Sequence, residues 1–476
     1  MRTLPRCVIW LGLLSGAAGG LTPAAAQRAG ELEAIDRYVQ AELTRHQVPG
    51  ASVAVLRDGR VLLARGYGSA NLEHRVPATD STIYQSGSVG KQFTAALVLM
   101  LAREGRLGLD DPVRRYLPGP PSWDSITIRH LLTHTSGSPD YADSTLDYRR
   151  DYTEDQLVTL AGGLPLEFEP GTHWAYSNTG YLLLGAIVRR TTGRFYGDLL
   201  HERVFAPVGM PTARIISERD LVPNRSDGYR LVDGRIQHQD WVAPSLNTTA
   251  DGSLYLSLRD LVRWSAALDR GPVPGRALLD SAWTPVRLRD GGTHPYGFGW
   301  DLTEQRGYRR IGHGGSWQGF RSTIQRYPEY GVTVIVLANL AEAEPEAMAY
   351  AIAGMLEPKL AAAHLMDPGR AGKPAPPAPI PQLLRTVADG ASDGLTPRLE
   401  RFLLPLAWRS AGELLQPGTE WRFAGCDDVA GRGMQRLGDN IAWVCYARGV
   451  RELATHLVEI DYTTDWRAAF IDWYGY

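Results

Sequence analysis

One short segment carries most of the chemistry in this chain of 476 residues: Ser88-Val89-Gly90-Lys91, followed directly by the apolar run Gln92-Phe93-Thr94-Ala95-Ala96-Leu97. At a helix start, positions i and i+3 lie on one face, so the Ser88 hydroxyl and the Lys91 amine are expected to touch. A serine needs a base to become a nucleophile, and a desolvated lysine helps to supply one. The helix N-terminus adds backbone N–H donors that favour developing negative charge. The segment predicts a nucleophilic serine, although the spacing alone also fits a solvated helix lysine.

Lysine is scarce in this chain, which makes Lys91 informative. Lysine and arginine together number 50, yet only three of them are lysines, at positions 91, 359 and 373. Arginine stays protonated in proteins, whereas lysine can lose its proton. Only Lys91 stands three residues after a serine at a predicted helix start. This placement favours a lysine that exchanges a proton.

Two further segments contain candidate site residues. In Tyr176-Ser177-Asn178 the phenol is a possible general base beside an ammonium, and the amide can orient substrate or lysine. The other reading is a loop tyrosine packed on the core, with the asparagine capping the next helix. The glycines around His313 allow close backbone approach, so the N–H of Ser316 can join that of Ser88 in an oxyanion hole. The other reading there is a bulge or turn with an incidental histidine.

The pattern of apolar residues predicts a mixed α/β (α+β) fold. β-prone runs cover 51–56 and 61–66 near one end and 296–302, 319–326 and 332–337 near the other. Helical spacing covers 93–101, 128–132, 181–190 and 261–268 between them, and 344–365 after them. We therefore expect an antiparallel sheet closed by remote segments and flanked by helices, with an inserted helical region.

The domain boundaries follow from composition. A proline-dense stretch, 367–382, predicts an extended linker. It separates a body of residues 28–366 from a small α+β tail of residues 383–476 with a helical start at 383–404. Within the body, the sheet part is expected at about 28–87 and 290–366 and the helical part at about 88–289.

The first 26 residues are predicted to be a signal peptide. Two arginines precede an apolar stretch, and Ala24-Ala25-Ala26 before Gln27 fits a cleavage site. A retained anchor helix is the alternative, although the stretch is short and rich in glycine. Cys426 and Cys445, each in a strand-like run, then predict a disulfide in an oxidising compartment, with two buried free thiols as the alternative. The mature protein is expected to be periplasmic or secreted.

Taken in order, these segments resemble the serine β-lactamase and penicillin-binding-protein superfamily, and most of all its class C-type branch of esterases and D-aminopeptidases. The likeness extends through nearly all of residues 30–360. It rests on the stretches 88–117, 128–137, 174–185, 252–264, 296–300 and 312–319. The resemblance implies a β-lactamase/transpeptidase-like fold. The tail is similar to the small nuclear-transport-factor-like domains attached to some members.

The resemblance also implies a role for each candidate residue. Ser88 would be acylated, Lys91 would be its electrostatic and proton-transfer partner, and Tyr176 would be the general base that later protonates the leaving group. Asn178, His313, Gly315 and Ser316 would bind the substrate or its oxyanion. The family pattern has a lysine in its third motif, where this chain has His313. A histidine is mostly neutral near pH 7 and holds a substrate carboxylate less dependably. This departure favours an esterase, amidase or peptidase over an efficient β-lactamase.

Several other functions are disfavoured. With 50 basic and 52 acidic residues, charge gives no reason to expect nucleic acid or an anionic membrane as partner. His130 and His134 have helical spacing, but no third zinc ligand is evident, so structural roles are expected. We expect no metal or cofactor. The expected partner is a small-molecule or peptide substrate. The alternatives are a penicillin-binding or peptidoglycan-sensing protein, a true β-lactamase and a D,D-carboxypeptidase. The oligomeric state is left open.

Overall fold

Two apolar runs that lie far apart in the sequence pair at the centre of the protein. β1 (Gly50–Arg57) runs antiparallel to β14 (Val332–Ala338), with Ala51 opposite Ala338. The computed structural model describes residues 23–141, 146–215, 220–271, 273–361, 375–403, 415–451 and 454–475. The predicted antiparallel sheet closed by remote segments is confirmed.

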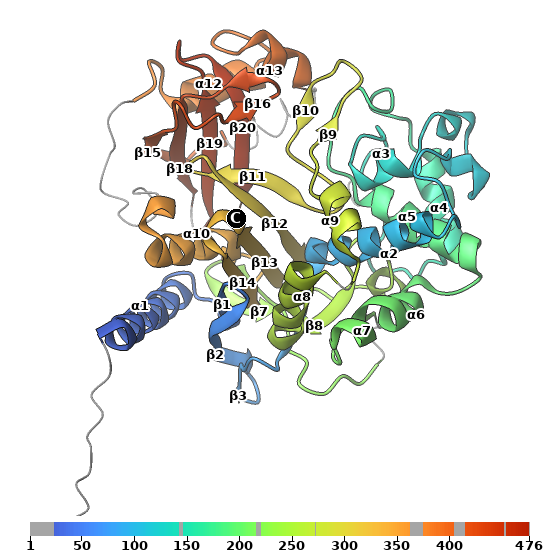
Figure 1. Ribbon diagram of the computed structural model, residues 1–476, viewed down its shortest axis with the longest axis horizontal. Coiled ribbons are helices and arrows are strands. Elements are labelled where there is room, and N and C mark those ends of the chain that lie inside the picture. Colours follow the sequence, from blue (N-terminus) through green and yellow to red (C-terminus); the bar gives the residue numbers. More distant parts are fainter. Residues whose placement is uncertain are drawn as a thin grey trace, which may run out of the picture.

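The sheet has seven strands in the order β11-β12-β13-β14-β1-β2-β3 (Figure 1). Its other strands are β2 (Arg60–Asn71), β3 (Val76–Pro77), β11 (Asp301–Gln305), β12 (Tyr308–Trp317) and β13 (Phe320–Tyr327). Every neighbouring pair is antiparallel.

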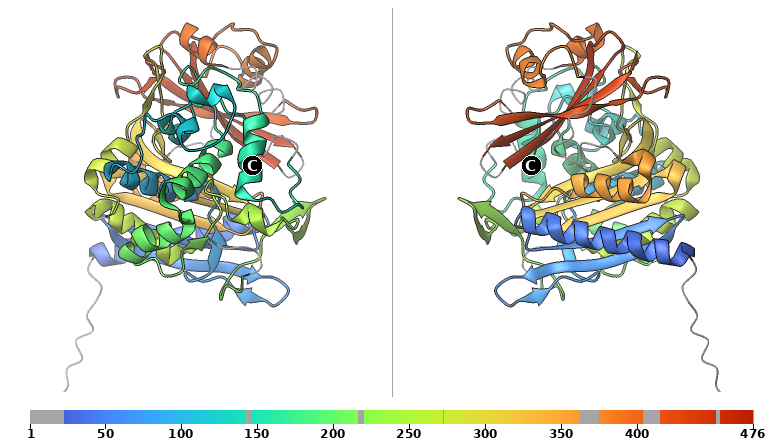
Figure 2. Two further views of the ribbon diagram at one scale, coloured as in Figure 1. Left: turned by 90° about the vertical axis from the view of Figure 1, so that its right-hand side faces the viewer. Right: turned by 90° about the vertical axis from the view of Figure 1, so that its left-hand side faces the viewer.

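Helices cover both faces of this sheet, which is why the central strands β1 and β14 are buried along almost their whole length. In β14, Val334 and Val336 pack towards α1 (Pro23–Arg45) and α10 (Pro345–Leu356), whereas the alternate residues Ile335 and Leu337 join the core of the helical region. Successive side chains of a strand point to opposite faces, so both sets are buried. Figure 2 shows α1 and α10 side by side over one face.

The helical region comprises the chain from Ile83, where β4 begins, to the start of β11, and it covers the opposite face of the sheet (Figure 1). Its helices are α2 (Lys91–Arg103), α3 (Ile128–Leu132), α4 (Glu154–Gly163), α5 (Asn178–Thr192), α6 (Tyr196–Leu200), α7 (Ala206–Val208), α8 (Leu258–Arg270) and α9 (Arg276–Ala282). Its short strands are β4 (Ile83–Gln85), β5 (Arg214–Ile215), β6 (Tyr229–Val232), β7 (Arg235–His238), β8 (Leu254–Ser257), β9 (Val286–Arg287) and β10 (Thr293–His294). None of the described helices combines the length and apolar composition that crossing a bilayer requires.

The described residues between 375 and 475 form what we call the C-terminal unit, with a sheet and an apolar core of its own. Its four main strands have the order β15-β18-β19-β20. The unit contains α12 (Ile380–Ala388), α13 (Pro397–Phe402), β15 (Glu420–Asp428), β16 (Gln435–Arg436), β17 (Asp439–Asn440), β18 (Trp443–Arg451), β19 (Ala454–Tyr462) and β20 (Ala468–Gly475). Cys426 and Cys445 face each other on β15 and β18 and form a disulfide.

Some predicted boundaries differ from the structure. The strand expected from residue 296 starts at Asp301, because Gly299 has a φ of +76° and turns the chain first. The helix expected over 344–365 stops at Leu356, since Glu357 precedes a proline and is extended. The helix expected over 383–404 is two helices, α12 and α13. Residues 1–22 of the predicted signal peptide and 367–374 of the predicted linker lie outside the described residues. α1 begins at Pro23 and α12 at Ile380, inside the ranges predicted for the signal peptide and the extended linker.

Candidate active site

The Ser88 hydroxyl and the Lys91 amine meet where a short 3-10 turn, η1 (Gly87–Gly90), runs into α2. Lys91 Nζ lies 3.0 Å from Ser88 Oγ. Lys91 is fully buried, and burial lowers its pKa to about 8. The negative charges of Asp251 and Asp140 raise this pKa, but by less than burial lowers it. The amine is therefore far easier to deprotonate than an exposed lysine.

The other contacts of Lys91 show how a neutral amine would be oriented. Nζ lies 2.6 Å from Asn178 Oδ1 and 2.5 Å from the backbone oxygen of Asp251. Both atoms only accept hydrogen bonds, so they take the two hydrogens of a neutral amine. Its lone pair is then left for the hydroxyl of Ser88. This arrangement suits Lys91 to accept a proton from Ser88.

Asp140 fixes the orientation of Asn178, the first residue of α5. Its Oδ2 accepts hydrogen bonds from the backbone nitrogen and from Nδ2 of Asn178, at 3.0 and 2.8 Å. The amide oxygen is consequently turned towards Lys91 rather than away from it.

Tyr176 completes the cluster on an irregular segment before α5. Its ring centroid lies 4.9 Å from Lys91 Nζ and 4.2 Å from that of His134. Burial raises the pKa of Tyr176 well above its ordinary value, although Ser88 lowers it in part. Its hydroxyl makes no hydrogen bond of normal geometry within the described residues. As pH rises, Lys91 therefore loses its proton before Tyr176 does.

A chain of hydrogen bonds beside the ring of Tyr176 connects His134, through Tyr296, to His313. His134 Nδ1 accepts from the backbone N–H of Ser177 at 3.2 Å, so its Nε2 carries the hydrogen and donates to Tyr296 Oη at 3.1 Å. His313 Nδ1 lies 2.5 Å from the oxygen of Gly314 and donates to it. His313 Nε2 then accepts from Tyr296 Oη at 2.9 Å. Both nitrogens of His313 are therefore engaged, and burial lowers its pKa.

The backbone of β12 lies directly against that of η1. A Cβ added to Gly87, whose φ is +50°, would lie 2.3 Å from the nitrogen of Ser316. One added to Gly315 would lie 3.0 Å from the nitrogen of Ser88. Glycine is required at both positions for this approach, which brings the segments bearing the Ser88 and Ser316 N–H groups together.

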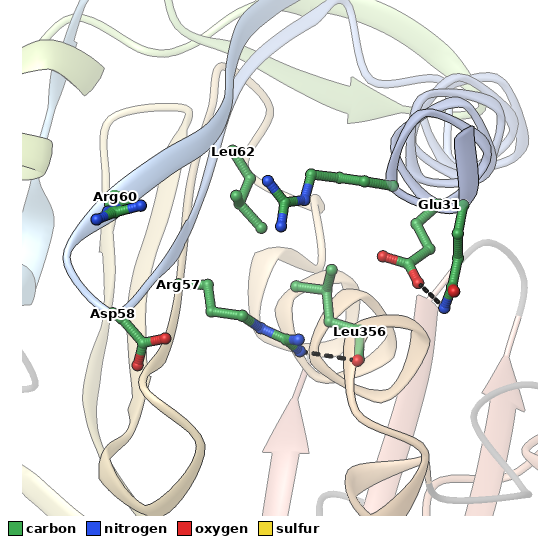
Figure 3. A pocket seen from close by; sticks show the side chains of 8 residues that line it. Glu31, Arg57, Asp58, Arg60, Leu62 and Leu356 are labelled. Atoms are coloured by element: carbon green, nitrogen blue, oxygen red, sulfur yellow. Dashed lines mark hydrogen bonds between the residues drawn. The ribbon is translucent and has the colours of Figure 1, made fainter. Parts of the chain in front are cut away.

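A narrow hollow of about 50 Å³ opens beside Ser88. It is lined by Gly87, Ser88, Tyr141, Asn178, Asp251, Gly252, Ser253, Ser316 and Trp317. A larger cavity of about 590 Å³ lies between α1, the β1–β2 hairpin and α10 and shares none of these residues (Figure 3). Its Arg57 is turned to the backbone oxygen of Leu356, 2.9 Å away (Figure 3). That cavity offers no serine–lysine pair.

The structure brings Ser88, Lys91, Tyr176 and Asn178 together and sets Gly315 and Ser316 against them. His313 lies beside them, with its ring centroid 6.2 Å from that of Tyr176, and both of its nitrogens are bonded to Tyr296 and Gly314. The Cys426–Cys445 disulfide lies in the C-terminal unit. Sequence reasoning missed Asp140, Tyr141, Asp251 and Tyr296. A sequence signal existed, since these four stand within or beside the quoted stretches 128–137, 252–264 and 296–300.

The two histidines with helical spacing have separate structural partners. His130 accepts the backbone N–H of Thr127 in a capping box of α3. His134 lies in the aromatic cluster beside Tyr176. The described residues contain no group of three or more His, Cys, Asp or Glu placed to hold a metal ion.

Comparison with known proteins gives a family match and individual relatives. The profile of a family described as "Beta-lactamase" matches residues 35–356. Penicillin-binding protein 4* of Bacillus subtilis (strain 168) is 33% identical over 317 residues, which are 63% of this chain and 69% of that protein. A D-aminopeptidase of Gluconobacter oxydans (strain 621H) is 32% identical over 330 residues. These are 68% of this chain but only 62% of the aminopeptidase.

A solved structure matches nearly the whole chain. It is the octameric penicillin-binding protein homologue from Pyrococcus abyssi, with a TM-score of 0.61 and 24% identity. The match covers 94% of this chain and 96% of that one, so the shared fold includes most of the C-terminal unit.

Proposed function

Since this chain is a serine hydrolase that belongs to the Beta-lactamase family, we propose that it hydrolyses amide or ester bonds in small substrates bearing a free amino group beside the scissile carbonyl. Its relative in Gluconobacter oxydans is a D-aminopeptidase, a name that describes removal of a residue with a free amino end.

The charge of the hollow beside Ser88 carries this proposal. Asp251 is the only charged residue among those that line it within the described chain. Its Oδ2 accepts the hydroxyl of Tyr141 at 2.8 Å, whereas Oδ1 is buried and has no hydrogen-bond partner among the described residues. The negative charge of Asp251 on the wall of the hollow favours an ammonium and repels the carboxylate of a β-lactam or a D-Ala terminus.

Acylation begins with neutral Lys91. Ser88 Oγ attacks the substrate carbonyl as Lys91 Nζ takes the hydroxyl proton, and the backbone N–H groups of Ser88 and Ser316 stabilise the oxyanion. The phenol of Tyr176 donates its proton to the leaving amine or alkoxide and is reprotonated by Lys91. The products are an ester on Ser88 and the free leaving group.

Deacylation uses the same groups in reverse. A water replaces the leaving group, its proton passes to Lys91, and its oxygen attacks the ester carbonyl. The second tetrahedral species collapses, Ser88 recovers its proton, and the carboxylic acid product departs.

A penicillin-binding sensor that acylates with little turnover is the second candidate, favoured by the match to penicillin-binding protein 4*. One pair of assays separates the two. Fast hydrolysis of a chromogenic short-chain ester with slow hydrolysis of a chromogenic cephalosporin supports the hydrolase. A stable stoichiometric penicillin adduct without ester turnover supports the sensor.

Asp251→Asn is expected to reduce the preference for free amines. The measurement is kcat/KM on an amino-acid p-nitroanilide and on its N-acetylated form. The ratio of the two should fall by about tenfold or more, because the attraction between the substrate ammonium and the carboxylate of Asp251 is lost. Ser316→Ala changes an uncharged lining side chain and keeps the backbone N–H, so its ratio should match that of wild type. An unchanged ratio in Asp251→Asn would remove Asp251 from substrate selection.

The pH dependence should report the lowered pKa of Lys91. Only the neutral amine accepts the proton of Ser88, so kcat/KM should rise with pH and level off above about 8. Tyr176 remains protonated over this range because burial raises its pKa. An ester without ionisable groups is the substrate of choice, since a substrate amine titrates in the same range. A flat profile across pH 8 would contradict a proton-accepting Lys91.

We also propose that the protein is exported. The amino-acid pattern of residues 1–26 and the Cys426–Cys445 disulfide support an oxidising destination.

A further inference from the structure

Buried ion pairs fix the C-terminal unit against the edge strand of the body sheet. Arg436, whose side chain is 2% exposed, pairs with Glu304 of β11 and with Asp461 of β19, at 2.7 Å in the second case. Arg306 Nε lies 3.1 Å from Asp427 Oδ1. The Arg436–Asp461 pair lies within the unit, whereas the Arg436–Glu304 and Arg306–Asp427 pairs join the unit to the body. A buried charge without its partner is costly, so these two pairs hold the unit in one place on the body.

Aromatic contacts continue from this interface to the candidate active site. The ring of Phe470 on β20 lies 6.0 Å from that of His294, and the guanidinium of Arg436 lies 5.5 Å from the Phe470 ring. His294 stacks on Trp174 with centroids 3.9 Å apart and planes at 19°. Trp174 stands two residues before Tyr176, and their rings are 6.5 Å apart.

The segment that carries Trp174 and Tyr176 has little backbone support. It lies in no helix or strand, and its hydrogen bonds run from Ala175 N to the oxygen of His134, at 3.0 Å, and from Ser177 N to the ring of His134. The position of the Tyr176 ring therefore depends on the rings packed beside it. His134 supports it directly, and His294 supports it through Trp174.

We propose that the C-terminal unit positions the catalytic phenol: Phe470 holds His294 against Trp174, and Trp174 holds the segment of Tyr176 in place. Burial and the charge of Arg436 lower the pKa of His294 well below its ordinary value, so the stacked imidazole is neutral and needs no counter-ion. The unit is then part of the working enzyme although it contributes no reacting group. The inference holds for whichever ester or amide the enzyme prefers.

The test is Phe470→Ala in the full-length chain. We expect kcat on a chromogenic ester to fall about tenfold with KM nearly unchanged, since a small displacement of a catalytic group costs rate more than binding. The rate at which a fluorophosphonate labels Ser88 should fall in parallel, which reports on the site even if the proposed substrate class is wrong. His294→Phe keeps a stacked ring and should retain most of kcat, whereas His294→Ala should lose it.

Trp466→Ala is the matched control. Trp466 stacks on Trp443 inside the C-terminal unit, with centroids 5.3 Å apart, and is absent from the contacts that lead to Tyr176. Its kcat should stay within about twofold of wild type even where thermal stability falls. A folded Phe470→Ala protein with unchanged kcat would overturn the proposal, as would an equal loss in Trp466→Ala. Phe470→Leu replaces Phe470→Ala if the latter does not fold.

Discussion

Lys91→Arg is expected to lower kcat/KM by about 10³-fold or more while preserving the positive charge. Arginine cannot release a proton at any accessible pH, so it cannot take one from Ser88. The planar guanidinium also cannot direct a lone pair at Ser88 Oγ, as a neutral amine does between Asn178 and the backbone of Asp251. The measurement is steady-state hydrolysis of a chromogenic ester, with thermal unfolding to confirm the fold.

Lys359→Arg is the matched control, because Lys359 is the other lysine among the described residues and is exposed. It should retain wild-type activity. Lys91→Met separates the two properties of the side chain, because it keeps length but removes amine and charge, and it should be as inactive as Lys91→Arg. An arginine variant with more than a tenth of wild-type activity would make Lys91 a plain cation.

Tyr176→Phe is expected to lower kcat by about 10²- to 10⁴-fold with no loss of stability. The hydroxyl is the proton donor to the leaving group, so its removal stops that step. Since it makes no hydrogen bond of normal geometry among the described residues, removal strands no buried partner. Activity and the midpoint of thermal unfolding are measured on the same preparation.

Tyr181→Phe should lower stability rather than activity. Its hydroxyl donates to the backbone oxygen of Leu132 at 2.9 Å in the core. Losing that bond should cost about 1 kcal/mol of unfolding free energy and far less activity than Tyr176→Phe. If Tyr176→Phe proves fully active, Tyr176 is not the proton donor.

The fold could be predicted from the sequence because its decisive pairing involves strongly patterned segments. β1 and β14 are predominantly apolar and lack the alternation of polar residues seen in half-exposed strands, which is typical of strands covered on both faces. The ends of elements were harder, since they depend on single residues such as Gly299 and the proline after Glu357. The likeness of the tail to nuclear-transport-factor domains stays a prediction.

The candidate site likewise contains residues whose contact the sequence predicts and residues whose contact it does not. Ser88 and Lys91 are three residues apart, so helix geometry alone predicts their contact. Asp140 and Asp251 act on the site only through tertiary contacts, and apart from their place beside the stretches 128–137 and 252–264 no local pattern marks them. The substrate-binding role of His313 stays a prediction, and nothing in the sequence indicates that the hydroxyl of Tyr296 bonds to its imidazole. No pattern in the sequence links residues 294 and 470, which the fold places side by side.

Because the chain has only three lysines, the buried amine of Lys91 can be observed selectively by NMR. Protein grown with isotopically labelled lysine contains at most three labelled side chains, so the resonance of the active-site amine stands almost alone. Its ionisation can be followed directly by NMR in the resting enzyme, without a substrate and without altering any atom of the pocket.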